Sequence, residues 1–324
     1  MKSECFPVDY STLSASALLN TVVSNYDLPL ATSIAFLKRG FNDTYLINTG
    51  IKKYILRVYK YQWRSLASIE TELKLINTLN ANGVGVSYPI ETAGTKQFIL
   101  SLNAPEGIRY AVLFSFAEGV NIKKLSIQQA HVLGQEVGKI HRLTHNQSFG
   151  ETAHHYDIEE QFNKAIATLE PVLKDYPEQF TYITNLRTEF IKRFNSLDKK
   201  ELKTGICHGD LQSENYHVSE DGKLTFFDFD FFGNGYLAYD IGVFVWYDHK
   251  NKSPQIIQSF LDGYQLHCTL SETEKKLIPY FSTIRALFQM RLYCDLNNGH
   301  KMPLWPAKEV ATFIDKVKKW QERR

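Results

Sequence analysis

The sequence has little of several features that mark common classes of protein. No apolar run approaches the roughly 20 residues that a membrane-spanning helix needs, and the start, MKSECFPVDYSTLS, lacks the apolar core of a signal peptide. The four cysteines (Cys5, Cys207, Cys268 and Cys294) lie far apart and form no paired metal or redox motif. We therefore expect a cytoplasmic protein with buried free thiols and no membrane partner.

An excess of charge of one sign is also lacking. The 37 Lys and Arg residues nearly balance the 35 Asp and Glu residues, for a net charge of +2, so we expect no nucleic-acid partner. The sequence contains no internal repeat and no low-complexity segment. What it does contain is 324 residues, of which 44% are hydrophobic and 22% charged, as in an ordinary globular protein long enough for two lobes.

The first third of the chain is mostly strand-like. The stretch SIAFLKRGFNDTYLINTGIKKYILRVYK predicts three short antiparallel strands, with breaks at 39–43 and 48–50. Apolar residues at helical spacing predict a helix at about 64–79, and KQFILSL and RYAVLFSF predict two further strands. Beyond Gly119 the pattern becomes helical, except for a predicted hairpin formed by NYHVS and KLTFFDF.

These patterns predict an α+β protein made of two lobes. The N-terminal lobe, residues 1–114, would hold a small antiparallel sheet and one main helix. A hinge at 115–120 would lead to a larger, mostly helical C-terminal lobe at 121–324.

The stretch HGDLQSEN, residues 208–215, precedes two carboxylates set among phenylalanines in LTFFDFDFF. Burial of an ionised carboxylate without a partner is costly, and the cation nearest in sequence to Asp228 and Asp230 is Lys223. The hairpin folds the chain back, so Asn215 and Asp228 can converge on one point. A carboxylate and an amide carbonyl suit Mg²⁺ brought in by a nucleotide, which leaves Asp210 to accept the proton of a hydroxyl.

The pattern HGDLQSEN…FFDFD resembles the catalytic loop and the metal-binding Asp of the protein-kinase-like fold. Gly after the His, where protein kinases have Arg, is similar to the aminoglycoside phosphotransferase/choline kinase superfamily, above all to its type II homoserine kinases and bacterial stress-response kinases. The resemblance covers roughly residues 35–250. It implies a bilobal fold, ATP and Mg²⁺ as cofactors, Asp210 as base, Asn215 and Asp228 as metal ligands, and His208 as a packing residue.

Other interpretations of the motif remain open. The His-Gly-Asp sequence could be a strand end with a solvated Asp, and Asp228 and Asp230 could lie in a turn. A metallophosphatase cluster is a further alternative, although it needs several more His and Asp ligands, which the flanking sequence does not show.

Arg57, in YILRVYK, stands where the resemblance places a cation, usually Lys, that holds the α- and β-phosphates. On the helix that follows, Glu72 falls on the apolar arc and Glu70 falls outside its centre. A carboxylate on the inward arc calls for a cation, and Arg57 is the candidate. An exposed edge-strand Arg and a Glu that reaches solvent are the alternatives.

The resemblance also implies the remaining nucleotide contacts. Residues 39–47, with Asn42, would form the turn that covers the phosphates, although an ordinary hairpin turn explains them as well. Phe114 would back the adenine pocket. The C=O of Ser115 and the N–H of Ala117 would meet the adenine edge, in a segment that a plain linker also explains.

Two further aspartates are supporting candidates. Asp230 replaces the glycine of the Asp-Phe-Gly triplet of protein kinases and could assist the metal or bind backbone. Asp240, in LAYDIGVFVW, resembles the Asp that braces the catalytic loop, although a role as helix N-cap would explain it without any function.

The acceptor is the least determined part of the site. Residues 156–178 are acid-rich, as a polyamine or aminoglycoside site would be, whereas the chain from Lys250 onward has 13 Lys and Arg against 7 Asp and Glu. Arg285 and Arg291 in this basic part could clamp a carboxylate, although either run could be a solvated helix face. A carboxylate-bearing amino alcohol fits the resembled branch.

Three functions follow from these features. The first is a kinase that phosphorylates a hydroxyl of a small molecule, namely an amino alcohol or a homoserine-like or aminoglycoside-like compound. The second is a protein kinase of the stress-response type, and the third is a nucleotide-binding pseudokinase that serves as an interaction module. Retention of Asp210, Asn215 and Asp228 together argues against the pseudokinase. The sequence does not separate ATP from GTP.

Overall fold

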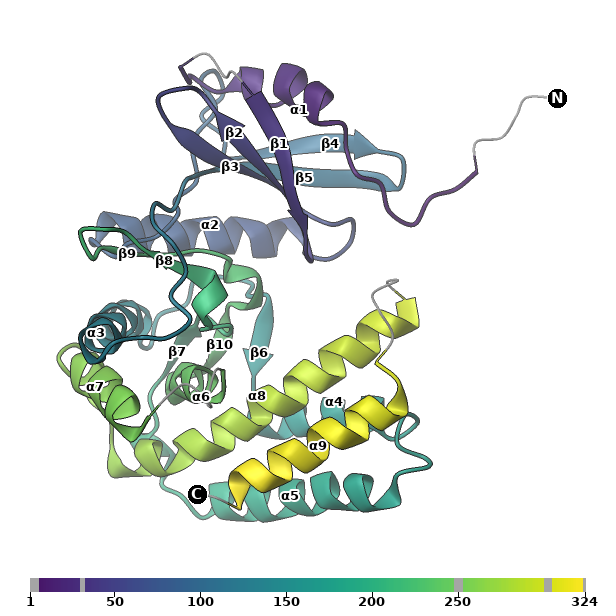
Figure 1. Ribbon diagram of the computed structural model, residues 1–324, viewed down its shortest axis with the longest axis vertical. Helices are drawn as coiled ribbons and strands as arrows, with labels where there is room; N and C mark the ends of the chain where they lie inside the picture. The colour runs from purple at the N-terminus through teal and green to yellow at the C-terminus, as the bar shows by residue number, and fades with distance from the viewer. Residues whose placement is uncertain (1–5, 30–32, 248–252, 300–304, 323–324) are drawn as a thin grey trace. The chain divides into compact units, whose positions relative to one another are not determined.

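The computed structural model describes residues 6–29, 33–247, 253–299 and 305–322 (Figure 1). The chain divides into two compact units. Unit 1 consists of residues 1–121, 149–153 and 216–228, and unit 2 of residues 122–148, 154–215 and 229–324.

Unit 1 is built on a five-stranded antiparallel sheet with the strand order β1-β2-β3-β5-β4. All five strands predicted from the sequence are present. Gly50, at a φ of 78°, makes the turn from β2 to β3, where a residue with a Cβ would be strained. The strands are β1 (Ser33–Arg39), β2 (Asp43–Asn48), β3 (Lys53–Val58), β4 (Ile99–Ala104) and β5 (Gly107–Ser115).

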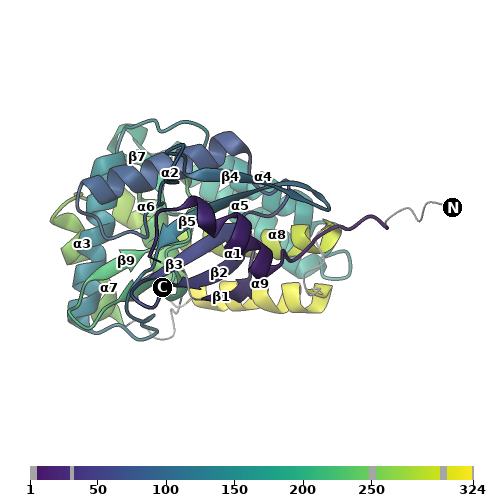
Figure 2. The same ribbon diagram turned by 90° about the horizontal axis from the view of Figure 1, so that it is seen from above.

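Helices cover both faces of this sheet (Figure 1). Helix α1 (Ala15–Thr21) and the 3₁₀ turn η1 (Val23–Asn25) lie over one face, and the view from above shows α1 crossing the strands (Figure 2). Helix α2 (Leu66–Ala81), which confirms the helix predicted at 64–79, begins after Ser65, whose side chain caps the N–H of Ser68. The core under α1 consists of Leu18, Val22, Val23, Tyr26, Tyr45, Ile47, Leu56, Val58, Ala111 and Leu113.

The predicted hairpin is present as β8 (Tyr216–Val218) and β9 (Leu224–Phe226), but it groups with unit 1 and not with the helical part of the chain. The reason lies in backbone pairing. Val218 forms a bridge with Val120, and Phe226 exchanges hydrogen bonds with Gly85 and Ser87, at 2.9 and 2.8 Å. Long-range pairing of this kind leaves no local signal in the sequence.

Unit 2 is mostly helical around a three-stranded sheet with the order β6-β10-β7. Helix α3 packs on α7, α6 packs on α8, and α4 contacts both α5 and α8. Helix α6 is buried along its whole length. The elements are α3 (Ile127–Thr144), β6 (His154–Tyr156), α4 (Ile158–Leu169), α5 (Pro177–Asn195), η2 (Lys199–Glu201), β7 (Thr204–Cys207), η3 (Ser213–Asn215), η4 (Phe229–Phe231), β10 (Gly233–Tyr236), α6 (Ala238–Trp246), α7 (Pro254–Gln265), α8 (Glu272–Gly299) and α9 (Ala307–Gln321).

The cysteines agree with the expected free thiols where the structure describes them. Cys207, Cys268 and Cys294 are buried and unpaired, and Cys5 lies outside the described residues. Within the described part of the chain, no helix combines the length and the apolar character that a membrane crossing requires.

Candidate active site

The loop that follows β7 carries the His-Gly-Asp sequence, and Gly209 is required by its geometry. Gly209 has a φ of 79°, and a Cβ there would lie 2.0 Å from the carbonyl oxygen of Phe231 and 2.2 Å from the hydroxyl of Tyr156. No side chain fits in that space. The glycine that distinguishes this motif from its protein-kinase counterpart is therefore a packing requirement of unit 2.

Asp240 braces this loop from inside α6. Its carboxylate accepts hydrogen bonds from the backbone N–H groups of His208 and Gly209, at 2.7 and 2.8 Å, and from Nε2 of His141 at 3.0 Å. Burial opposes the charge of Asp240, but His141 and the other donors lower the pKa of this carboxyl below its usual value. Asp240 is not the N-cap of α6, because Leu237 holds that position, without a side-chain capping bond, and Asp240 lies in the first turn.

Sequence reasoning missed His141. Its ring bonds Asp240 through Nε2 and meets the hydroxyl of Tyr264 through Nδ1, at 2.9 Å. The signal was present, since Leu133, Val137 and His141 follow one another at i+4 on a predicted helix.

Asp210 is held on both carboxylate oxygens. Oδ1 accepts a hydrogen bond from Nη2 of Arg285, and Oδ2 accepts from the side-chain amides of Gln212 and Asn215, each at 2.8 Å. Asn215 also uses its Nδ2 to reach the carbonyl oxygen of Asp210, at 2.9 Å. Because both bonds of Asn215 use the nitrogen, the amide oxygen is the atom left to bind a metal.

The predicted acceptor-binding arginines on α8 occupy different environments. Arg285 is only 3% exposed and pairs with Asp210, a carboxylate of the chain itself, which differs from its expected role as a clamp for an acceptor carboxylate. The side chain of Arg291 is 12% exposed and forms a longer ion pair of 3.7 Å with Asp295. Burial lowers the pKa of Arg291, and Asp295 opposes this effect.

Arg57 is the centre of the polar cluster in unit 1. Its guanidinium donates to Glu72 at 3.1 Å and to Asp228 at 3.2 Å. The predicted pair of Arg57 with Glu72 is therefore present. Arg57 is also the partner of Asp228, which has no cation near it in sequence.

Glu72 is fully buried and has more partners than sequence reasoning anticipated. Besides Arg57, it pairs with Arg64 at 3.3 Å and accepts a hydrogen bond from the hydroxyl of Tyr59 at 3.1 Å. Arg64 precedes α2 and has no periodic signal of its own, so the sequence did not single it out.

This arrangement makes a prediction about stability. Glu72→Gln should lower the free energy of unfolding more than Arg57→Gln, because Glu72 is the counter-charge for two guanidiniums, that of buried Arg64 and that of half-buried Arg57. The double variant should cost less than the sum of the two, by about 0.5–3 kcal/mol. Urea unfolding of the four proteins measures both quantities. Strict additivity would contradict the coupling, and Lys38→Gln, on β1, is the surface control.

The backbone of Asp228 is in the left-handed region, at a φ of 62°. Its side chain is 30% exposed, which leaves room for a ligand beside Arg57. Asn215 belongs to unit 2 and Asp228 to unit 1, so their predicted convergence stays a prediction. Asp230 is buried in η4 of unit 2, and its assistance to a metal also stays a prediction. Among the described residues, no group of three or more His, Cys, Asp or Glu side chains could hold a metal ion.

The predicted adenine-binding segment lies at the end of β5. Phe114 is buried there, and its ring lies 5.4 Å from the guanidinium of Arg57. The carbonyl oxygen of Ser115 accepts a hydrogen bond from Oγ of Ser87 at 2.5 Å, and that of Ala117 meets Nδ1 of His217 at 2.8 Å. The predicted hinge is therefore held by two hydrogen bonds within unit 1, one from Ser87 and one with His217. Sequence reasoning missed the contact of His217.

Asn42 lies in the turn between β1 and β2. Its side chain is buried and accepts a hydrogen bond from the backbone N–H of Lys60 at 3.1 Å. The amide therefore holds the turn in this structure, and a contact of Asn42 with nucleotide stays a prediction.

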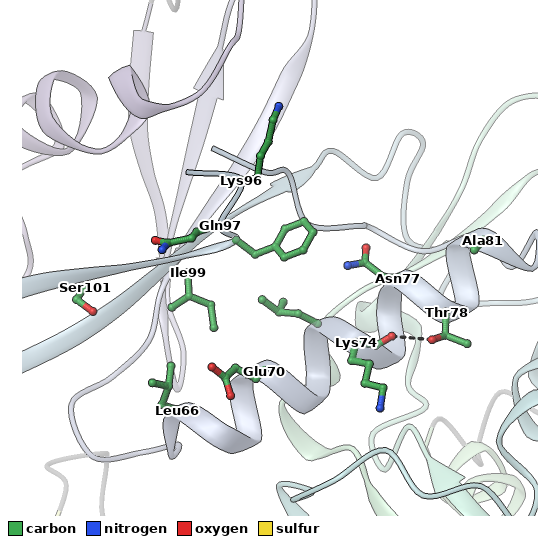
Figure 3. Close-up of a pocket in the computed structure, with 12 residues that line it drawn as sticks. Leu66, Glu70, Lys74, Asn77, Thr78, Ala81, Lys96, Gln97, Ile99 and Ser101 are labelled. Carbon is green, nitrogen blue, oxygen red and sulfur yellow. Dashed lines mark hydrogen bonds between the residues drawn. The ribbon is translucent and has the colours of Figure 1, made fainter. Parts of the chain in front are cut away.

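A groove of about 770 Å³ lies between α2 and β4, on the outer side of the helix (Figure 3). Glu70 and Lys74 line it from α2, opposite Gln97 and Ile99. The outward position of Glu70 and the inward position of Glu72 agree with the predicted orientation of this helix. None of the candidate site residues lines the groove.

The chain is similar to known proteins in both sequence and fold. A model of the phosphotransferase enzyme family matches residues 33–277. An uncharacterized protein of Synechocystis sp. is 32% identical over 276 residues, 84% of this chain and 76% of that protein. A homoserine kinase of Afipia carboxidovorans is 25% identical over 324 residues, with coverage of 95% and 93%.

Among solved structures, an amicoumacin kinase in complex with AMP-PNP, Ca²⁺ and Ami superimposes with a TM-score of 0.73 at 21% identity. The match covers 94% of this chain and 91% of that one. This likeness concerns the fold, and it confirms the predicted kinase-like architecture.

Proposed function

We propose that this chain, which belongs to the phosphotransferase enzyme family, transfers the γ-phosphate of ATP to a hydroxyl group of a small molecule with the help of Mg²⁺. The observation that carries the proposal is the environment of Asp210. Its carboxylate is 5% exposed and is bound on both oxygens by three side chains, on a loop that Asp240 braces. A carboxylate fixed in this way suits a general base that must meet one hydroxyl in one orientation.

The chemical step assigns one role to Asp210. The hydroxyl oxygen of the acceptor forms a bond to the γ-phosphorus, and its proton passes to the Asp210 carboxylate. The bond between the γ-phosphorus and the bridging oxygen breaks, and ADP leaves with the electron pair. Positioning supplies most of the acceleration, because the transition state requires little covalent chemistry from the protein.

The remaining candidates would bind the nucleotide and its metal. Asn215 and Asp228 each offer one hard oxygen, which is the donor set that Mg²⁺ prefers when phosphates complete its shell. When bound, Mg²⁺ neutralises charge on the phosphates. Arg57 would hold the α- and β-phosphates, and Glu72 would keep its guanidinium oriented. Asp230 is a secondary candidate for the metal.

The adenine base of the nucleotide would bind beside the hinge. Phe114 would form the back of the pocket, and the carbonyl of Ser115 and the N–H of Ala117 would meet the edge of adenine. A carbonyl oxygen has two lone pairs, so the bond from Ser87 to Ser115 leaves one for the nucleotide. The turn that contains Asn42 would cover the phosphates.

The acceptor we propose is an amino alcohol, with homoserine-like compounds first because a homoserine kinase is among the relatives. Arg291 is the proposed partner for an acceptor carboxylate, because its ion pair with Asp295 is long and its side chain is partly exposed. Aminoglycoside-like acceptors remain a candidate class, since an aminoglycoside phosphotransferase of Alicyclobacillus acidocaldarius shares the fold.

A screen with radiolabelled ATP tests this function. The chain, Mg²⁺ and labelled ATP are incubated separately with L-homoserine, ethanolamine, choline, kanamycin and casein, with Asp210→Asn as the inactive control. We expect label in a small molecule. Label in casein alone would support a protein kinase. Calorimetric binding of MgATP with label in no acceptor would support a pseudokinase.

A further inference from the structure

The guanidinium of Arg285 is a buried cation in unit 2 to which the proposed chemical step assigns no role of its own. It extends from the middle of α8 and is 3% exposed. A cation at this depth is costly unless a carboxylate and good hydrogen bonds compensate for the loss of water. Its carboxylate partner is Asp210, and Nη2 also donates to the hydroxyl of Tyr247 at 2.5 Å.

Aromatic rings enclose the rest of this guanidinium. Its central carbon lies 5.6 Å from the ring of Phe231, 5.2 Å from that of Tyr247 and 5.0 Å from that of Phe288. Nε and Nη1 of Arg285 are buried and have no hydrogen-bond partner among the described residues. These distances are typical of cation–π contacts, so the rings hold the cation in place while Nη2 donates to Asp210 and Tyr247.

Tyr247 completes the arrangement. Burial raises the pKa of its hydroxyl, with a further contribution from the Asp210 carboxylate, so this hydroxyl stays protonated at neutral pH. Burial opposes the charge of Arg285, but Tyr247 and Asp210 raise the pKa of the guanidinium above its ordinary value. The hydroxyl of Tyr247 therefore stays neutral and the guanidinium of Arg285 stays charged over the working pH range of most enzymes.

We propose that Arg285 is a positioning residue that fixes the orientation of the base Asp210, rather than a residue that binds the acceptor. This inference rests on the proposed function, because the proposed phosphoryl transfer is the reaction in which Asp210 accepts a proton. The carboxylate of Asp210 accepts from Arg285 on Oδ1 and from Gln212 and Asn215 on Oδ2, and the hydroxyl of Tyr247 is a further neighbour of this carboxylate. By its hold on Oδ1, Arg285 sets the orientation in which the carboxylate of Asp210 meets the acceptor hydroxyl.

Arg285→Gln tests the proposal in steady-state kinetics with MgATP and L-homoserine or ethanolamine as the probe acceptor. Loss of a charge-assisted hydrogen bond on the base should lower kcat roughly ten- to a hundredfold, while KM for ATP and for the acceptor changes less than about threefold. Arg285→Lys, which retains the charge and one donor, should recover part of kcat. Arg187→Gln on α5, which removes an exposed ion pair with Glu159, is the matched control.

The Asp210→Asn background makes the test specific. A residue that acts through Asp210 should have little further effect on kcat once Asp210 is replaced, because residues that act as a unit are non-additive. An undiminished effect of Arg285→Gln in that background would overturn the proposal. A rise in acceptor KM at unchanged kcat would also overturn it, in favour of an acceptor clamp.

The experiments distinguish a failure of the inference from a failure of the proposed function. A wild-type chain that phosphorylates none of the probe acceptors contradicts the proposed function, and with it the role of Arg285. An active wild-type chain whose kcat survives Arg285→Gln contradicts the inference alone. Should the Gln variant prove unfolded by circular dichroism, the Lys variant supplies the same comparison, because it retains the counter-charge of Asp210.

Discussion

Replacement of Asp210 by asparagine should lower kcat by about 10²–10⁴-fold and leave the affinity for MgATP nearly unchanged. Asparagine has almost the same shape and can still accept a hydrogen bond from Arg285, but it cannot take the proton of the acceptor hydroxyl. Steady-state kinetics on the acceptor found in the screen, together with calorimetric titration of MgATP, measure the two quantities.

Stability must be followed in the same variant. Asn at position 210 leaves the Arg285 guanidinium buried without its counter-charge, and breaking a buried pair from one side costs on the order of 3–5 kcal/mol. Urea unfolding should show a loss of this size, so kinetics belong at a temperature where the variant is folded. Asp262→Asn, on the exposed face of α7, is the control. Loss of nucleotide binding as severe as the loss of turnover would assign Asp210 to the metal instead.

Asp228→Asn should abolish transfer and remove the Mg²⁺ dependence of nucleotide binding, because the carboxylate is the charged ligand proposed for the metal. Asn is the right replacement, since Asp228 has a φ of 62° and Asn is among the few residues that tolerate the left-handed region. Most other side chains would strain the backbone at this position, and that strain would obscure the effect of losing the carboxylate.

Two titrations separate loss of the metal from loss of the Arg57 contact. Calorimetry with ATP in EDTA and again with excess Mg²⁺ should show tighter binding with Mg²⁺ for the wild-type chain and no such gain for Asp228→Asn. Asp221→Asn, at the exposed turn of the same hairpin, should behave as wild type. If Mg²⁺ tightened ATP binding in the Asp228→Asn variant as much as in the wild-type chain, Asp228 would not be a metal ligand.

Local patterns in the sequence were sufficient for most of the secondary structure. Alternation of apolar and polar residues located the strands of unit 1, and the apolar arc of α2 placed Glu72 inward and Glu70 outward. Such signals survive in sequence because a half-buried element must repeat with the period of its own backbone. The His-Gly-Asp motif was also readable, because its residue types and short spacings are set within one loop.

Which charged side chains pair with one another was decided by the tertiary structure. The sequence offered no cation near Asp228, and the structure supplies Arg57 from a strand 171 positions earlier in the chain. The sequence suggested that Arg285 faces an acceptor, and the structure places it on Asp210.

What the sequence by itself determined is therefore the family and most of the strands and helices, and it also supplied the residues that we propose for phosphoryl transfer. Which of those residues touch one another was decided only by the tertiary structure, as Glu72 shows by its contact with Arg64 as well as Arg57. The physical reason is that a long Arg side chain can reach any carboxylate that packing brings within about 4 Å, and no local periodicity records which one that is.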